Sequence, residues 1–295
     1  MATADLLDRC AFPEGDLHLG VSGGTDSVAM AVLARAAERP FTIWHVHHGV
    51  RSAADADAAF VEALATDWGV PFELRRLDLD PAPNFEARAR TARYDALPDG
   101  VCVAHTANDR AETVLLNLFR GAGLAGTAAR MWSAHRPIIA LTRMDTVAVC
   151  DEAGIAPCED ETNEDTRNHR AAVRHCVLPE VARSLGRDPV PILNRHADLI
   201  ADALELVEAA AVKLDPTDVK ALREAPRAVT TEALRTWIQT ESCDPYPVDV
   251  ATIERVLEVV YGHRRAAETL GGHRVARSQG RLSISVASPD GQADT

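Results

Sequence analysis

The sequence predicts an α/β fold that is doubly wound around a mostly parallel sheet, followed by a smaller helical domain that ends in a β-hairpin. Strand-like and helix-like segments alternate up to residue 150, and the pattern after it is mainly helical. At roughly 150 residues per domain, the length of 295 residues corresponds to two domains. We therefore expect one domain at 1–185 and a second at 186–295, with the boundary near 184–188.

Four strands and four helices are expected in the first domain. Strands are predicted at 17–21, 41–46, 70–79 and 100–104; the second is rich in β-branched and aromatic residues, and the fourth is an apolar run. Apolar periodicity and stop signals such as Pro40 and Gly69 predict helices at 28–37, 53–68, 85–97 and 110–119. Ligands of such sheets bind beyond the carboxyl ends of the strands, so the loops after Val21, Val46 and Ala104 form the expected site.

The second domain is expected to be helical up to its last strands. A long amphipathic pattern predicts a helix at 192–212, and shorter ones predict helices at 230–239 and 250–261. Residues 270–284 are typical of a hairpin, and the polar residues from 287 onward are typical of a frayed end.

Composition excludes several kinds of chemistry. The net charge of −13 argues against indiscriminate nucleic-acid binding, although arginines cluster at 167–187 and 264–281. The lysines are Lys213 and Lys220, so the chain before them can hold neither a Walker A lysine nor a Schiff-base lysine. With no apolar run near the roughly 18 residues of a membrane span and no secretory pattern at the start, we expect a cytoplasmic protein without a membrane partner.

The six cysteines are scattered without a C-x-x-C pair, which indicates free thiols rather than disulfides or a zinc site. Cys102 lies inside an apolar run, so we expect it to be a buried thiol. His45, His47 and His48 do not make a convincing zinc site either, because alternate strand residues point to opposite faces and no partner carboxylate is evident.

The loop at 22–27, S-G-G-T-D-S, carries the strongest chemical signal. Gly23 and Gly24 let backbone amides approach an anion, and the following helix start adds a favourable dipole. Asp26 would repel a bare polyphosphate unless Mg²⁺ bridges the carboxylate and the phosphate oxygens. The plainer alternative is a glycine-rich turn whose aspartate caps the helix.

This loop resembles the PP-loop of the N-type ATP pyrophosphatases, which cleave ATP between its α- and β-phosphates. Together with five later motifs, it resembles the tRNA(Ile)-lysidine synthetase family over 15–185, and more loosely over 271–284. Those five motifs lie at 45–51, 86–94, 105–113, 120–126 and 160–179. The resemblance implies a Rossmann-like PP-loop ATP pyrophosphatase domain.

The resemblance also implies a reaction and its partners. ATP would adenylate the C2 carbonyl oxygen of the cytidine at the first anticodon position of a CAU-anticodon tRNA(Ile), releasing pyrophosphate. Free L-lysine would then attack C2 and expel AMP, giving lysidine. The expected cofactors are ATP and Mg²⁺, and a homodimer is compatible with the sequence.

Site residues follow from the family motifs position by position. The expected catalytic residues are Asp26, Arg90, Asp109 and Glu112, with Asp26 also holding Mg²⁺. The expected ATP-binding residues are Ser22, Gly23, Gly24, Thr25, Asp26, Ser27, His45, Val46, His105 and Gly121. The expected tRNA-binding residues are Arg167, Arg170, Arg174, Arg274 and Arg277.

Within this set, Arg90 would stabilise the transition state at the α-phosphate, with Glu86 orienting it. On spacing alone, Arg90 and Glu86 could equally form an exposed ion pair one helical turn apart. Asp109 and Glu112 share a helix face and would receive the lysine ammonium, accept its proton or complete the metal site. A capping acid and a surface glutamate are their plainer alternative.

The chain departs from the family pattern at four positions. Asn108 stands where the family usually has aspartate, and Arg110 stands where it has glutamine. Glu161 replaces a common proline, and Ala171 replaces an asparagine. None of these changes touches the loop at 22–27, so they concern local geometry more than the reaction.

Three other functions compete with this interpretation. A tRNA 2-thiolation enzyme of the same fold would need paired cysteines, which the sequence lacks. A small-molecule amidating ligase related to NAD or GMP synthetase would not explain the basic tail. The intact loop at 22–27 and Asp109 argue against a catalytically inactive tRNA-binding protein, although Asn108 and Ala171 keep this alternative open.

Overall fold

The computed structural model describes residues 3–47, 54–77, 85–129, 135–158, 169–243, 248–269 and 272–286. The chain divides into two compact units, one of residues 1–119 and 129–196 and the other of residues 120–128 and 197–295. The division falls inside the long helix α10 (Val190–Ala211), after residue 196. The expected boundary near 184–188 lies just before this helix.

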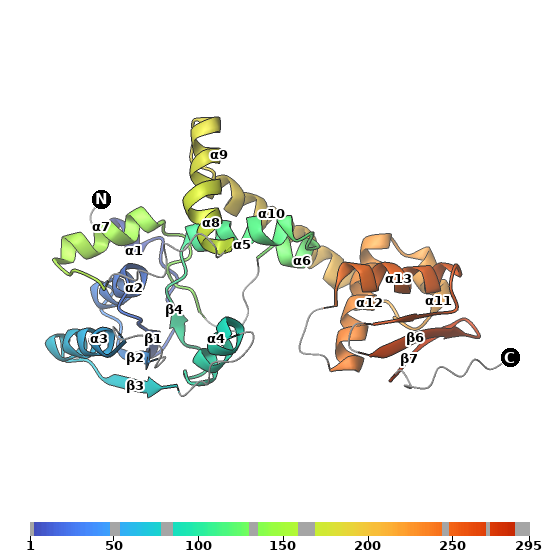
Figure 1. Ribbon diagram of the computed structural model, residues 1–295, viewed down its shortest axis with the longest axis horizontal. Coiled ribbons are helices and arrows are strands. Elements are labelled where there is room, and N and C mark those ends of the chain that lie inside the picture. The colour runs from blue at the N-terminus through green and yellow to red at the C-terminus, as the bar shows by residue number, and fades with distance from the viewer. Residues whose placement is uncertain are drawn as a thin grey trace. The chain divides into compact units, whose positions relative to one another are not determined.

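A four-stranded parallel sheet forms the centre of the first unit, in the order β3-β2-β1-β4 (Figure 1). Its strands are β1 (Leu17–Gly20), β2 (Phe41–His47), β3 (Phe72–Arg76) and β4 (Cys102–Val103). The chain moves outward from β1 to β3 and returns to pair β4 on the other side of β1. The strand order therefore reverses between β1 and β4, which is where open α/β sheets bind ligands.

Helices cover both faces of this sheet. In Figure 1, α2 (Thr25–Ala36) and α3 (Ala54–Trp68) lie on one side of the sheet, and α4 (Phe85–Asp95) lies on the other. Leu19 and Ile43 from the strands pack with Val28 and Leu33 from α2 in a fully buried core. The doubly wound α/β fold expected from the sequence is therefore confirmed.

The last strand of the sheet is shorter than expected. A strand was expected at 100–104, but β4 covers two residues, and His135 continues the sheet beside it. The His135 N–H donates to the Val101 carbonyl, and the Val103 N–H donates to the His135 carbonyl. A residue from a distant segment thus supplies pairing that no local pattern indicates.

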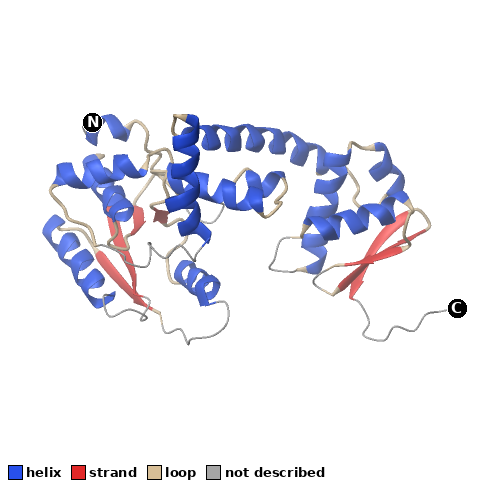
Figure 2. Ribbon diagram, turned by 45° about the horizontal axis from the view of Figure 1, so that its top comes forward, coloured by secondary structure: helices blue, strands red, loops and turns tan. Residues whose placement is uncertain are grey.

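Further helices complete the first unit. α5 (Ala107–Phe119) follows β4, and α7 (Arg143–Ala153) packs against α2. A capping box between Thr142 and Asp145 starts α7, and Gly154 ends it in the left-handed conformation. The other helical segments are α1 (Thr3–Leu7), α8 (His169–Ala172), the π-helical turn η2 (Val173–Val177) and α9 (Leu178–Leu185), drawn as helices in Figure 2.

The second unit combines helices with a small antiparallel sheet. Its helices besides the end of α10 are α6 (Leu124–Thr127), α11 (Val219–Glu224), α12 (Arg227–Ser242) and α13 (Val250–Tyr261). Its sheet has the order β5-β6-β7, with β5 (Ala266–Glu268), β6 (His273–Ser278) and β7 (Arg281–Val286).

The expected terminal hairpin is confirmed as β6 and β7, which pack Val275 and Leu282 against Val256 of α13. The third strand, β5, was not expected, because its residues have low strand propensity. In the part of the chain that the structure describes, no helix is both long and apolar enough to cross a bilayer.

Candidate nucleotide-binding and catalytic site

The loop at 22–27 joins β1 to α2 at the carboxyl end of β1. Gly23 has φ of +97°, which favours glycine, and a Cβ at this position would lie 3.3 Å from Cys158 Sγ. Gly24 is the N-cap residue of α2 and has no side chain to accept hydrogen bonds from the first-turn amides. The loop therefore combines backbone freedom with a helix start suited to an anion.

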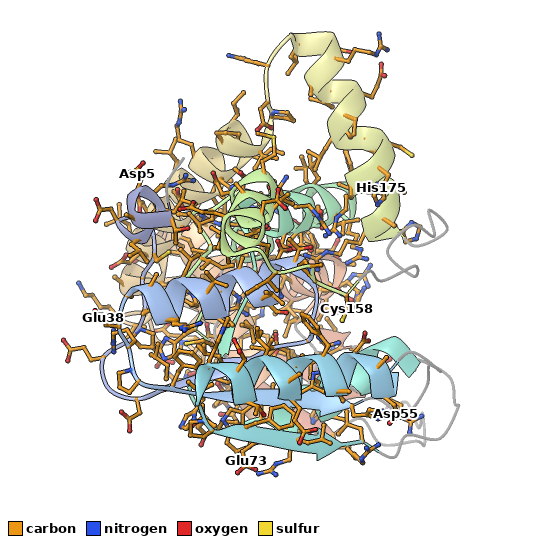
Figure 3. The ribbon with its side chains drawn as sticks, turned by 90° about the vertical axis from the view of Figure 1, so that its left-hand side faces the viewer. Asp5, Glu38, Asp55, Glu73, Cys158 and His175 are labelled. Atoms are coloured by element: carbon orange, nitrogen blue, oxygen red, sulfur yellow. The ribbon has the colours of Figure 1, made fainter. Side chains whose placement is uncertain are left out.

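Hydroxyl groups hold the two ends of this loop together. The Ser22 N–H donates to Ser27 Oγ at 3.1 Å, and the Ser27 hydroxyl donates to the Gly24 carbonyl at 2.8 Å. The Cys158 N–H donates to the Gly23 carbonyl from outside the loop. Figure 3 shows Cys158 near the N-terminal end of α2, far from Glu38 at the other end of that helix.

Asp26 lies in the first turn of α2, and its Oδ1 accepts a hydrogen bond of 2.6 Å from the Thr146 hydroxyl. Burial raises the pKa of Asp26, with a smaller contribution from the charge of Asp109. The Thr146 hydrogen bond and the charges of Arg143 and Arg174 act in the opposite direction without cancelling the shift. The protein's own groups thus compensate the negative charge of Asp26 only in part.

That incomplete compensation fits a bound cation. The described residues contain no group of three or more His, Cys, Asp or Glu side chains that could hold a metal by themselves. A Mg²⁺ ion at Asp26 would take its other oxygen ligands from phosphate and water, as Mg²⁺ commonly does in nucleotide sites. Asp26 as a single carboxylate ligand is compatible with this arrangement.

Asp109 and Glu112 lie three residues apart on α5 and face two arginines. Arg170 Nε lies 2.8 Å from Glu112 Oε2, and Arg174 Nε lies 2.6 Å from Glu112 Oε1. The Nη2 atoms of both arginines contact Asp109 Oδ1, at 3.1 and 3.2 Å. The two arginines lie four residues apart across α8 and η2, so helical spacing brings both onto the same pair of acids.

This acid–arginine cluster, defined as Asp109, Glu112, Arg170 and Arg174, contains two carboxylates and two guanidinium groups. Glu112 is fully buried, and Asp109 also accepts hydrogen bonds from the N–H and hydroxyl of Thr106. Burial alone would raise the pKa of Asp109, but Arg170 and the Thr106 N–H outweigh it and hold that pKa below its usual range. Asp109 is therefore anionic at neutral pH.

Electrostatics connect the cluster to the loop at 22–27. The charges of Asp109 and Arg174 both act on Asp26, and the charge of Asp26 in turn raises the pKa of Arg174. Burial lowers the pKa of Arg174, but its hydrogen bond to Glu112 and the nearby acids outweigh this effect. Three of the four expected catalytic residues, Asp26, Asp109 and Glu112, thus belong to one electrostatic environment.

The expected histidines have protein partners in the structure. His45 is buried, and its Nδ1 donates to the Val21 carbonyl at 2.8 Å, which ties the end of β2 to the end of β1. Burial lowers the pKa of His45 and favours its neutral form. His47 contacts Asp55 at 3.1 Å, and the Arg136 Nε donates to His105 Nδ1 at 2.9 Å. Val46 follows His45 in β2 and lies opposite Arg75.

Several expected residues lie partly or wholly outside the described part. Arg90 is on α4, but its side chain and that of Glu86 are outside the described residues. Arg167, Glu161 and His48 are also outside them. Gly121 has φ of +71° and belongs to the 120–128 segment of the second unit.

The two expected arginines of the tail lie on β6. They are three residues apart, so the strand places Arg274 and Arg277 on opposite faces of the sheet. A Cβ added to Gly262 would lie 3.0 Å from the Arg277 guanidinium, which places Arg277 at the carboxyl end of α13. Arg274 is exposed and lines a hollow of about 530 Å³ together with Arg255 and Arg264.

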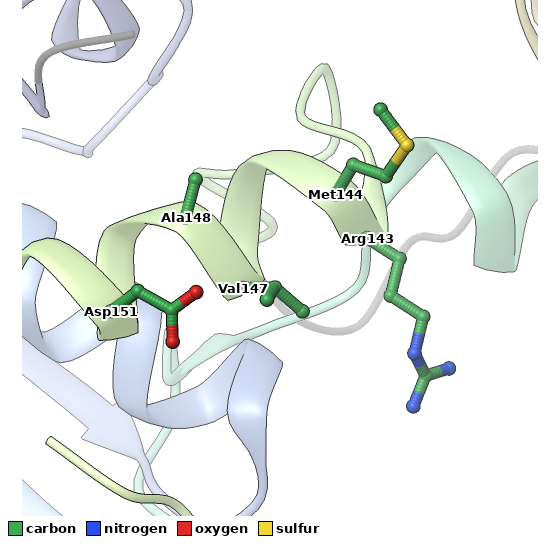
Figure 4. Close-up of a pocket in the computed structure, with 5 residues that line it drawn as sticks. All are labelled: Arg143, Met144, Val147, Ala148 and Asp151. Carbon is green, nitrogen blue, oxygen red and sulfur yellow. The ribbon is translucent and has the colours of Figure 1, made fainter.

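Sequence reasoning missed the contribution of α7. The Thr146 hydroxyl binds Asp26 of α2, and the Arg143 backbone N–H donates to Asn108 Oδ1 of α5 at 2.9 Å, so α7 contacts the starts of both helices. Figure 4 shows Arg143 at one end of an open hollow of about 350 Å³ along α7. Its capping box at Thr142 and Asp145 was the available signal for this helix.

A family profile described as a PP-loop domain matches residues 3–181. The parallel sheet and the loop at 22–27 accordingly define a protein of the PP-loop class, whose domains use ATP. The tRNA(Ile)-lysidine synthase of Bordetella pertussis is 37% identical, with 91% of this chain and 95% of the relative covered. The tRNA(Ile)-lysidine synthase of Salinispora arenicola is 35% identical, with 92% and 90% covered. The chain belongs to the tRNA(Ile)-lysidine synthase family.

A solved structure supports the fold independently. The U34-tRNA thiolase NcsA from Methanococcus maripaludis matches 68% of this chain and 78% of its own, with a TM-score of 0.57. The sequence identity is 14%, so this likeness concerns the fold alone.

Proposed function

We propose that the protein is a ligase that forms lysidine in tRNA. It joins free L-lysine to C2 of the cytidine at the first anticodon position of a CAU-anticodon tRNA(Ile) and consumes ATP to AMP and pyrophosphate. The observation that carries this proposal is the similarity to lysidine synthases over nine-tenths of the chain. The position of Asp26, Asp109 and Glu112 around one site supports it.

The first step is adenylation of the cytidine. Its C2 carbonyl oxygen attacks the α-phosphate of ATP, and pyrophosphate leaves. The amides at 22–27 and the α2 N-terminus bind the β- and γ-phosphates, and the hydroxyls of Ser22 and Ser27 join them by exchanging their hydrogen bonds within the loop for bonds to phosphate oxygens. Asp26 holds Mg²⁺, which neutralises phosphate charge when bound. Arg90 is proposed to stabilise the charge that develops on the α-phosphate.

The second step is attack of the deprotonated lysine amine on C2, in which the C–N bond forms, the C2–O bond to AMP breaks and the amine proton is released to solvent. We assign Asp109 and Glu112 to recognition of the lysine side chain. Because the pKa of Asp109 is low, it binds a cation better than it accepts a proton. Arg170 and Arg174 already engage both acids, so the ammonium must share or replace one arginine contact. Such an exchange replaces one cation with another and leaves the local charge balance unchanged.

The tRNA is proposed to bind through arginine side chains. Arg274 is exposed on β6 and can contact a backbone phosphate. Arg170 and Arg174 were expected to serve the same purpose, and their internal ion pairs make them candidates for phosphate contact only if those pairs open. Arg167 stays a prediction outside the described residues.

A tRNA thiolase is the competing function within this fold. The described residues bring no three metal-ligating side chains together, and the six cysteines lie apart from one another along the chain. No observation on this chain therefore favours thiolation.

The test is direct. The purified protein is incubated with ATP, Mg²⁺, L-lysine and a CAU-anticodon tRNA(Ile) transcript, and the digested nucleosides are analysed by mass spectrometry. We expect a lysine-adducted cytidine that disappears when ATP or lysine is omitted, or when the anticodon cytidine is replaced. ATP binding without any adduct would overturn the proposed reaction.

A further inference from the structure

Thr146 contacts the PP-loop aspartate from a different part of the chain. It is fully buried on α7, and its hydroxyl donates to Asp26 Oδ1 at 2.6 Å across 120 residues of sequence. A hydrogen bond to a carboxylate is charge-assisted and stronger than a neutral one. Since Thr146 lies in the helix that packs along α2, both partners are held on rigid elements.

Local structure does not require this contact. The Thr146 hydroxyl also lies 2.9 Å from the Arg143 carbonyl, one turn back on α7, which is the usual acceptor for a threonine in a helix. A hydroxyl donates one proton, so it serves only one acceptor at a time. Without Asp26, the hydroxyl could still donate to the Arg143 carbonyl. The bond to Asp26 is therefore not needed to satisfy Thr146, and its main effect is on the position of Asp26.

Two further contacts from the same side hold the adjacent loop residues. The Cys150 thiol lies 3.5 Å from the Thr25 carbonyl, and the Cys158 N–H donates to the Gly23 carbonyl at 3.0 Å. Thr146, Cys150 and Cys158 thus support three successive parts of the loop from α7 and the segment after it. Of these three residues, Thr146 is the one that contacts the side chain of Asp26, to which we assign the cation.

We propose that Thr146 is a positioning residue for nucleotide binding: its hydrogen bond to Oδ1 fixes the orientation of the Asp26 carboxylate, which would bind the cation that accompanies ATP. This inference rests on the metal-binding role of Asp26 within the proposed function. It does not depend on which base or amine reacts after ATP has bound.

The experiment measures binding without turnover. Titration calorimetry gives the affinity for ATP with Mn²⁺ and for ATP with a metal chelator, in the absence of tRNA and lysine. We expect Thr146→Val to weaken metal-dependent ATP binding by roughly tenfold, with metal-free binding changed much less. Thr146→Ser keeps the hydroxyl and should restore binding to within about twofold of the original protein.

Thr230→Val is the matched control. Thr230 is also fully buried, and its hydroxyl donates to the Leu222 carbonyl in the second unit. This variant should lose stability to a similar degree and keep its metal-dependent affinity. Thr146→Ala provides a second hydroxyl deletion if the valine does not fold.

Unchanged Mn²⁺–ATP affinity in Thr146→Val would overturn the proposal. An equal loss of metal-dependent and metal-free binding, without rescue by serine, would also overturn it and assign Thr146 a packing role. Failure of the lysidine assay with these binding results intact would instead count against the proposed reaction alone.

Discussion

Arg174 binds both carboxylate oxygens of Glu112: its Nε lies 2.6 Å from Oε1, and its Nη2 lies 3.0 Å from Oε2. This two-point contact matches the planar guanidinium to the carboxylate and joins η2 to α5. Glu112 has no exposed surface, so water cannot replace a lost partner. Buried pairs of this kind matter less for their net attraction than for the charge that remains when one partner is removed.

Removal of Glu112 should therefore destabilise the first unit. We expect Glu112→Ala to lower the free energy of unfolding by about 3–5 kcal/mol, because it leaves Arg174 partly buried without its main partner. Urea denaturation followed by circular dichroism measures the change. Glu180→Ala breaks an exposed pair with Arg183 and should cost less than about 1 kcal/mol. Equal losses in the two variants would contradict the structural role of Glu112.

Asp109 should make the stability depend on pH. Its pKa is lowered in the folded state, so its stabilising contribution is complete above the unfolded value of about 3.9 and is lost as the pH falls through the folded value. We expect Asp109→Asn to be less stable than the original protein at pH 7, with the difference shrinking below about pH 4. A difference that stays constant over this range, measured by denaturation, would refute the argument.

Asp109 should also separate lysine use from ATP binding. We expect Asp109→Ala to raise the KM for lysine by at least about tenfold, because a charged contact to the ammonium is lost. The affinity for ATP should change by less than about threefold, since the loop at 22–27 keeps its own hydrogen bonds. Steady-state kinetics and calorimetry provide the two values. An unchanged KM for lysine would remove Asp109 from the lysine pocket.

The sheet and the loop could be predicted because their signals are local. Gly23 stands where the backbone needs positive φ, and β2 is rich in β-branched and aromatic residues. The boundaries of α13 match the predicted range of 250–261 because an aspartate N-cap and Gly262 mark its two ends. Sequence patterns of this kind identify single elements and the loops between them.

The pairing of distant side chains could not be predicted in the same way. Arg174 and Glu112 are 62 residues apart, and helical spacing alone suggested a basic surface for Arg170 and Arg174. Thr146 carries no motif, and its role becomes evident only when α7 is packed on α2. Both contacts depend on how helices pack, which one sequence does not specify residue by residue.

Gly23 offers a test of the loop geometry. Gly23→Ala places a Cβ at φ of +97° and 3.3 Å from Cys158 Sγ, so we expect ATP affinity to fall by roughly tenfold. Gly69 also has positive φ, but a Cβ there meets open space. Gly69→Ala should cost about 1 kcal/mol of stability and leave ATP affinity unchanged. Calorimetry and denaturation compare the two variants, and equal ATP affinities would refute the strained-loop argument.

The two arginines of β6 should have different roles, because they lie on opposite faces of the strand. We expect Arg274→Glu to weaken tRNA binding several-fold and to reduce its salt dependence, since an exposed phosphate contact is lost.

Arg277→Glu should instead lower the thermal stability of the second unit. Arg277 lies against Gly262 at the carboxyl end of α13, where Arg223 donates to the Val260 carbonyl. A negative charge there opposes the helix dipole and costs about 0.3–1 kcal/mol before lost packing is counted. Filter binding at several salt concentrations, with thermal denaturation, separates the two effects. If Arg277→Glu weakens tRNA binding as strongly as Arg274→Glu while remaining equally stable, then both faces of β6 contact the tRNA.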